Sequence, residues 1–323
     1  MTKSLPVFNE RNVEPLSSSH ERTLVELVQK KIPESVIKKV IKYVQRPSNE
    51  KFYGMLTVRQ VVLLFLYYIT YGDSFIKMEI QFHIPHSNIS RAITILRSIL
   101  YTNIKNEIKF FPLAIRKRAI RRRTRAKWLH KCTVALDSID IPKAVTEIMK
   151  LKNLNKRKEK NTERGDMWRS HKLKNHHHAL RYHFACDFFY RIGYVSKYRP
   201  PTEYDGHGII RDKTRFENSL EEGDVVMADD HYRTVKRKIK KVGWVCPKRE
   251  TQKDWNPDTD VKKNKQQRAT RKLVETELSQ IANNFRVLAI PWKGSVIHHQ
   301  KMVWIIAAIH NLIVDTQYPN LVE

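Results

Sequence analysis

Apolar residues recur at helical spacing through the first hundred residues, after a polar, Ser-rich stretch over residues 1–20. The polar stretch predicts a flexible arm. Thr57 and Gln60 form a capping box ahead of the run VVLLFLYYITY, and Gly72 after that run is a natural C-terminal stop. We therefore expect a helical domain over residues 21–110.

Two shorter helices are predicted after this long apolar run. Ser74 is expected to open the first, which continues to about Phe82, and Ser87 to cap the second after Pro85. The second helix has one apolar face, made of Ile89, Ala92, Ile93, Leu96, Ile99 and Leu100. The pair outlines a helix-turn-helix, and a plain packing pair of helices is the alternative. In a helix-turn-helix the residues placed in the DNA major groove would be Asn88, Ser90, Arg91 and Thr94.

A dense basic segment follows. Residues 116–127 carry eight basic residues, no acidic residue and no glycine. If the segment is helical, one face presents Arg118, Arg121, Arg122 and Arg125. Such a stripe favours contact with a DNA backbone or with a nuclear import receptor, and a solvated face is the simpler alternative. We expect a basic linker helix over residues 111–130.

From Lys131 onward the pattern is typical of strands that alternate with helices. Strands are predicted at residues 132–136, 177–190, 191–198, 224–228 and 242–248. Helices are predicted at residues 208–220, around Glu275 and at residues 297–312. Residues 150–166 and 251–268 are rich in Lys, Asn and Gln and are typical of exposed loops. This order predicts an α+β or α/β fold over residues 131–323, with a mixed sheet flanked by helices.

Charge narrows the choice of partner. Lys and Arg total 61 against 33 acidic residues, so the formal net charge is +28 and the sequence pI is about 10.0. Such a surface binds a polyanion through counterion release, which favours double-stranded DNA. The three cysteines are far apart, which argues against a zinc finger or a disulfide scaffold. The longest apolar stretch, residues 61–69, is too short to span a bilayer, and no membrane partner is expected.

Three acidic residues stand in settings that suit metal-dependent chemistry. Asp137 and Asp229 each follow a short apolar run, so each is expected at the end of a buried strand, and Glu275 lies on a predicted helix. Carboxylates brought together in this way can hold two divalent metal ions, the arrangement that assists phosphodiester cleavage. A turn, a cap or a helix surface is the simpler interpretation of each acid on its own.

The segments around these acids resemble the PIF/Harbinger-like group of DDE transposases, which carry a DDE superfamily endonuclease domain. The similar segments are DSIDIP (137–142), MADDHY (227–232), VETELSQIANNFRVL (274–288) and the closing AAIHNL (307–312). SHK (170–172) and TEYD (202–205) resemble two further family signatures. The sequence departs from the family pattern where Ser138, His231 and Ser279 stand in place of the usual glycines. A lost glycine can change how closely a backbone approaches its ligand.

The resemblance implies an RNase H-like domain that cuts DNA at the ends of a mobile element and joins the freed strand to target DNA. Asp137, Asp229 and Glu275 would hold two magnesium or manganese ions, because such metals prefer carboxylate oxygens. Lys172 is expected to contact the scissile phosphate, with an exposed loop lysine as the simpler alternative, and Arg237 and Lys238 would line a DNA path beside the active site.

The resemblance also implies a homo-oligomer on DNA, a separate Myb-like accessory protein, and a location in the nucleus of a eukaryote or otherwise with nucleoid DNA in the cytoplasm. Because several glycines are replaced, the main alternative is a domesticated DNA-binding protein that keeps the fold but no longer cuts. A nuclease that acts on RNA or damaged DNA is a third interpretation.

Overall fold

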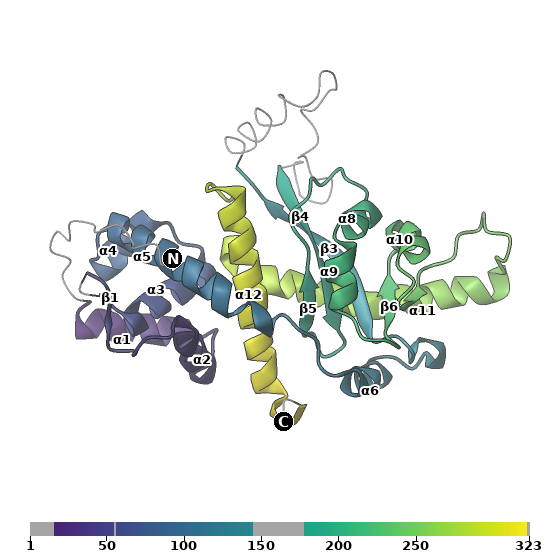
Figure 1. Ribbon diagram of the computed structural model, residues 1–323, viewed down its shortest axis with the longest axis horizontal. Coiled ribbons are helices and arrows are strands. Elements are labelled where there is room, and N and C mark those ends of the chain that lie inside the picture. Colours follow the sequence, from purple (N-terminus) through teal and green to yellow (C-terminus); the bar gives the residue numbers. More distant parts are fainter. Residues whose placement is uncertain (1–15, 55, 145–177, 322–323) are drawn as a thin grey trace, which may run out of the picture. The chain divides into compact units, whose positions relative to one another are not determined.

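The computed structural model describes residues 16–54, 56–144 and 178–321 and divides the chain into two compact units, Met1–Ile104 and Lys105–Glu323 (Figure 1). Of the arm expected over residues 1–20, the first fifteen residues lie outside the described part, and a helix already begins at Ser18.

Over residues 16–54 and 56–104, the first unit is helical apart from one short hairpin. Its elements are α1 (Ser18–Gln29), α2 (Glu34–Val44), β1 (Lys51–Tyr53), β2 (Leu56–Thr57), α3 (Val58–Tyr71), α4 (Phe75–Phe82) and α5 (His86–Asn103). The predicted capping box is confirmed: the Thr57 hydroxyl accepts the Gln60 N–H at 3.3 Å, and the Gln60 side chain accepts the Thr57 N–H at 3.0 Å. Gly72 ends α3 in the left-handed region at φ 68°. These signals act over one turn, so the sequence predicted both ends of α3.

Helices α4 and α5 form the predicted pair, with Ser74 as the N-cap of α4. The cap predicted at Ser87 is wrong. The Pro85 carbonyl already accepts the N–H of Ile89, so α5 begins at His86. The apolar face of α5 is buried except for Ile99, which is half-buried, while Arg91 and Thr94 are exposed and Asn88 and Ser90 are half-exposed.

The second unit is built on a mixed sheet, which among the described residues has five strands in the order β5-β4-β3-β6-β7. The strands are β3 (Val134–Pro142), β4 (Ala179–Asp187), β5 (Ile192–Val195), β6 (Val225–Ala228) and β7 (Gly243–Val245). Strand β4 is antiparallel to both β3 and β5, whereas β6 is parallel to both β3 and β7. This mixed α/β architecture is consistent with an α+β nuclease fold.

Helices cover both faces of this sheet. They are α6 (Leu113–Arg123), α8 (Asp205–Arg211), α9 (Lys213–Asn218), α10 (Arg233–Lys238), α11 (Pro257–Asn284) and α12 (Val296–Gln317). In Figure 1, α8 and α9 lie in front of the sheet and α11 passes behind it. Leu136 and Ala228 pack in a core with Ile209 of α8 and Phe216 of α9. Because side chains alternate along a strand, the residues that follow, Asp137 and Asp229, are turned toward α11 on the other face.

Three predictions about this unit need correction. Strand β3 does not end before Asp137 but continues to Pro142, because β4 pairs with it along its whole length. The loop predicted over residues 251–268 is wrong from Pro257 onward, where α11 begins. Its polar surface is that of a solvated helix with Asp260 and Gln267 buried. The helix predicted over residues 208–220 is two short helices that meet at Asp212. Residues 150–166 lie outside the described residues.

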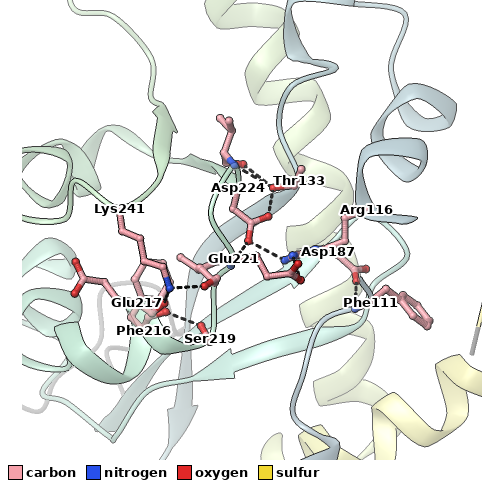
Figure 2. Close-up of polar contacts among 12 residues, drawn as sticks. Phe111, Arg116, Thr133, Asp187, Phe216, Glu217, Ser219, Glu221, Asp224 and Lys241 are labelled. Atoms are coloured by element: carbon pink, nitrogen blue, oxygen red, sulfur yellow. Dashed lines mark hydrogen bonds and ion pairs between the residues drawn. The ribbon is translucent and has the colours of Figure 1, made fainter. Parts of the chain in front are cut away.

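The basic segment is anchored in the second unit by a buried arginine. Helix α6 ends at Arg123, so Arg118, Arg121 and Arg122 are exposed on the helix while Arg125 is exposed beyond its end. Arg116 is fully buried and pairs with Asp224 at 3.0 Å and with Glu221 at 2.7 Å (Figure 2). Asp224 is itself fully buried. A charge pair of this kind ties α6 to the segment that leads into β6.

Helix α12 buries two histidines, His299 and His310. Burial lowers the pKa of His299 to about 3 and that of His310 to about 4. Both are therefore neutral in the folded protein at pH 5, whereas an unfolded histidine is protonated below about 6.5. The unfolded state binds more protons, so the free energy of unfolding falls as the pH is lowered below 6.5. Asp187, whose pKa burial raises to about 6, opposes this change between about pH 4 and 6.

We expect each histidine to lower the free energy of unfolding by about 2 kcal/mol between pH 7 and pH 5. In the variant His310→Gln, the part of this fall in unfolding free energy that the two histidines cause should be about half as large. Urea unfolding at the two pH values, followed by tryptophan fluorescence, measures it, because all six tryptophans lie in the second unit. The exposed His207 gives a control, since His207→Gln should keep the full pH dependence. An unchanged pH dependence in His310→Gln would contradict the prediction.

Candidate active site

Two of the predicted acids lie next to each other at one end of the parallel strand pair. The pairing of β3 with β6 ends at Leu136 and Ala228, and Asp137 and Asp229 are the residues that follow. Alternation along β3 turns Asp137 toward the face that α11 covers. The sequence separates these aspartates by many residues, and the parallel register brings them together.

The third acid reaches the same place from α11. Glu275 lies one helical turn after Arg271, and its Oε1 is 2.5 Å from the Arg271 Nη1. The same Nη1 is 3.1 Å from Asp137 Oδ2, and Arg271 Nη2 is 3.5 Å from Asp229 Oδ2. All three predicted carboxylates therefore surround one guanidinium. The site is partly open, since the side chains of Asp137 and Arg271 are 14% and 15% exposed and that of Glu275 is 38% exposed.

The two aspartates are oriented by their own backbones. Asp137 Oδ1 accepts the N–H of Ser138 at 2.8 Å, and Asp229 Oδ1 accepts the N–H of Asp230 at 2.6 Å. In each case the second oxygen is the one that contacts Arg271. This arrangement aims one oxygen of each aspartate at the shared point.

Asp230, which follows Asp229 directly, has a different role. Its carboxylate pairs with Arg233 at 2.5 Å and with Arg249, whereas the ion pairs of Arg271 are with the other three acids. The structure therefore separates the two neighbouring aspartates: Asp229 joins Asp137 and Glu275, and Asp230 holds the arginines of α10 and of the segment after β7.

Behind Asp137, the opposite face of β3 carries a buried charge cluster. Arg181 binds both oxygens of Asp140 at 2.7 and 3.0 Å and reaches Asp205 at 2.9 Å. Tyr232 is fully buried nearby, where burial and the charges of Asp205 and Asp137 raise the pKa of its phenol well above the ordinary value. Tyr232 is therefore neutral and can only donate or accept a hydrogen bond. This cluster ties α8 to the strand that carries Asp137.

A cavity of about 860 Å³, lined by four basic and three acidic residues, opens beside Asp229. Its wall includes Trp255, Arg249 and the exposed α11 residues Lys265 and Arg268. These two α11 residues lie on the approach to Arg271 and Glu275 along the same helix. A cavity with an indole and several cations next to a carboxylate site suits a nucleotide strand, because bases stack on aromatic rings and phosphates bind cations.

The chemistry of the donors suits a divalent metal of the magnesium type. All three are carboxylates, and Mg²⁺ prefers oxygen ligands from one or two carboxylates while it keeps several waters. Within the residues that the structure describes, no three His, Cys, Asp or Glu side chains are close enough to hold a metal as they stand. The three carboxylates surround the guanidinium of Arg271, which lies between them.

The other predicted site residues are distributed over both units. Arg237 and Lys238 are exposed on α10. Lys172 lies outside the described residues. The residues predicted for the major groove belong to the first unit, and the exposed arginines of the basic segment belong to the second.

Comparison with known proteins bears on this site. A family model described as DDE superfamily endonuclease matches residues 152–311. The chain is similar to the DDE endonucleases there. The matched range contains Asp229 and Glu275 and ends in α12, whereas Asp137 precedes it. No curated protein and no solved structure matches the chain.

Among the helices of the described residues, none is long and apolar enough to cross a membrane.

Sequence reasoning missed Arg271. The signal was present, because Arg271 and Glu275 are four residues apart on a predicted helix, a spacing at which opposite charges pair. That spacing alone predicts a surface ion pair of small energetic weight. Only the packing of α11 against β3 and β6 brings the same guanidinium to Asp137 and Asp229.

Proposed function

We propose that this chain is a transposase-like, metal-dependent DNA endonuclease with an Asp137, Asp229 and Glu275 triad. The observation that carries the proposal is the convergence of these three carboxylates on one cation beside the end of the parallel strand pair. The match to the DDE superfamily endonucleases supports it independently.

The chain's own groups would orient the reaction. When bound, two magnesium or manganese ions would supply the charge that activates the attacking oxygen and stabilises the leaving one. Asp137 and Asp229, each held by a backbone N–H, would present fixed oxygens to those ions, and Glu275 would complete the set from α11. Fixed ligands matter because a metal site loses activity when its ligands are loosely placed. We further propose that the sheet is RNase H-like and that the enzyme joins the cut strand to target DNA.

The DNA would be held by the basic surfaces. We propose that Lys265, Arg268 and the exposed residues Arg237 and Lys238 bind the strand near the site, and that Arg118, Arg121, Arg122 and Arg125 bind duplex backbone. Helices α4 and α5 would read the element ends as a helix-turn-helix through Asn88, Ser90, Arg91 and Thr94, of which Arg91 and Thr94 are exposed and the other two are partly exposed. A homo-oligomer on DNA, a Myb-like accessory protein, and a nuclear or nucleoid location remain proposals drawn from the family resemblance.

Nicking of supercoiled plasmid by the full chain tests the proposal. We expect nicked circles in manganese or magnesium and none in EDTA. Binding of a specific DNA sequence with no cleavage in either metal would instead support a domesticated DNA-binding protein. Cleavage of RNA in preference to plasmid would contradict the DNA assignment.

A further inference from the structure

Arg271 occupies the point at which the three carboxylates meet. An arginine stays charged at every pH that a protein tolerates, so its guanidinium neutralises part of the repulsion among three carboxylates. Its side chain is only 15% exposed, so water screens these contacts less than it would on an open surface. The guanidinium therefore holds the site together while no metal is present.

The oxygens that contact Arg271 are the ones that a bridging metal would need. The Oδ1 of Asp137 and that of Asp229 are occupied by backbone N–H groups, and the Oδ2 of each is turned to the guanidinium. Three carboxylates carry three negative charges, and two divalent ions together with the guanidinium would carry five positive charges. The metals and the guanidinium therefore compete for the same carboxylate oxygens and for the negative charge that those oxygens carry.

We propose that Arg271 is the internal counter-cation of this site, and that divalent metal enters by exchange with its guanidinium, which then binds a DNA phosphate. This inference rests on the proposed metal-dependent function. A guanidinium binds phosphate with two parallel hydrogen bonds, so DNA offers the released group a good partner. The nearby Arg268 and Lys265, at the wall of the cavity beside Asp229, lie along α11 where such a phosphate would pass.

This exchange couples the binding of metal to the binding of DNA. DNA that takes up the Arg271 guanidinium removes the competitor for the carboxylates, so DNA raises the affinity for metal. By linkage, metal must raise the affinity for DNA by the same factor. A strand in place therefore promotes loading of the metals, and the free protein holds them weakly.

Binding of manganese measures this exchange without any catalytic readout. Free Mn²⁺ is quantified by electron paramagnetic resonance for the wild type, Arg271→Gln and Lys272→Gln, each with and without a short duplex that gel analysis shows to be intact. Lys272 is the matched control, because it is exposed, adjacent on α11 and loses the same charge. Circular dichroism checks that each variant is folded.

Without DNA, Arg271→Gln should bind Mn²⁺ about tenfold more tightly than the wild type, a factor within the usual range of coupling between sites. DNA should raise the Mn²⁺ affinity of the wild type and of Lys272→Gln but not that of Arg271→Gln. Equal or weaker Mn²⁺ binding by Arg271→Gln would overturn the proposal.

Asp137→Asn separates failure of this inference from failure of the proposed function. If Asp137→Asn weakens Mn²⁺ binding in both the wild-type and the Arg271→Gln backgrounds, the metal site is real and the affinities decide the role of Arg271. If Asp137→Asn changes nothing in either background, the carboxylates are not the metal site, and the proposed function fails with this inference.

Discussion

Glu275→Gln is expected to slow manganese-dependent plasmid nicking about a thousandfold, the usual effect of removing one fixed electrostatic group from an active site. The substitution keeps the size of the side chain but removes the charge that would complete the metal site with Asp137 and Asp229. Glu275 is 38% exposed and contacts Arg271, so its loss should leave the core of the sheet intact. Without metal the variant should still bind duplex DNA, because the proposed DNA contacts other than Arg271 are basic residues elsewhere on the surface.

Glu277→Gln is the matched control for this experiment. Glu277 lies on the same helix, two residues further, where burial raises the pKa of its carboxyl group, and it is not one of the carboxylates that pair with Arg271. The Glu277→Gln variant should nick plasmid at the wild-type rate. Nicking rates are measured on gels under single-turnover conditions, and DNA binding by fluorescence anisotropy. Equal nicking by Glu275→Gln and the wild type would remove Glu275 from the mechanism.

Arg116→Met is expected to destabilise the second unit by about 3–5 kcal/mol, the range seen when one partner of a buried ion pair is removed. Arg116 and Asp224 are both fully buried, so the substitution leaves the Asp224 carboxylate without its cation in a place that water does not reach. The Thr133 hydroxyl still donates to Asp224 at 2.6 Å, and the Glu221 N–H donates at 2.8 Å. Neutral donors of this kind replace only part of the lost charge interaction.

Urea unfolding followed by tryptophan fluorescence measures this loss, since every tryptophan lies in the second unit. Arg118→Met on the same helix is the control. Arg118 is exposed, and its substitution should change the free energy of unfolding by no more than about 0.5 kcal/mol. Adding Asp224→Asn to Arg116→Met should restore part of the stability, because it removes the unpaired charge. Similar unfolding free energies for Arg116→Met and Arg118→Met would show that the buried pair does not anchor α6.

Buried and exposed charged residues look alike in the sequence. Residues 116–127 look uniformly basic, yet Arg116 is a fully buried ion-pair partner and Arg118 is exposed. A helical pattern can show which residues share a face, but a buried arginine becomes distinguishable only when its acidic partner is known. That partner, Asp224, lies more than a hundred residues away in the chain.

The sequence by itself determined the features that depend on neighbouring residues. The capping box of Thr57 and Gln60 and the stop at Gly72 act within a few residues, and the structure confirms them. The apolar run before Asp229 likewise predicted β6. Hydrophobic period and capping chemistry were sufficient for these elements, because they need no distant partner.

Tertiary structure alone decided what the candidate site is made of. Pairing with β4 extends β3 beyond Asp137, and pairing with β6 sets Asp137 beside Asp229. The packing of α11 on the same end of the sheet places the Arg271 guanidinium among the three carboxylates. Contacts between residues this far apart in the chain depend on strand register and helix packing, which local sequence patterns do not encode.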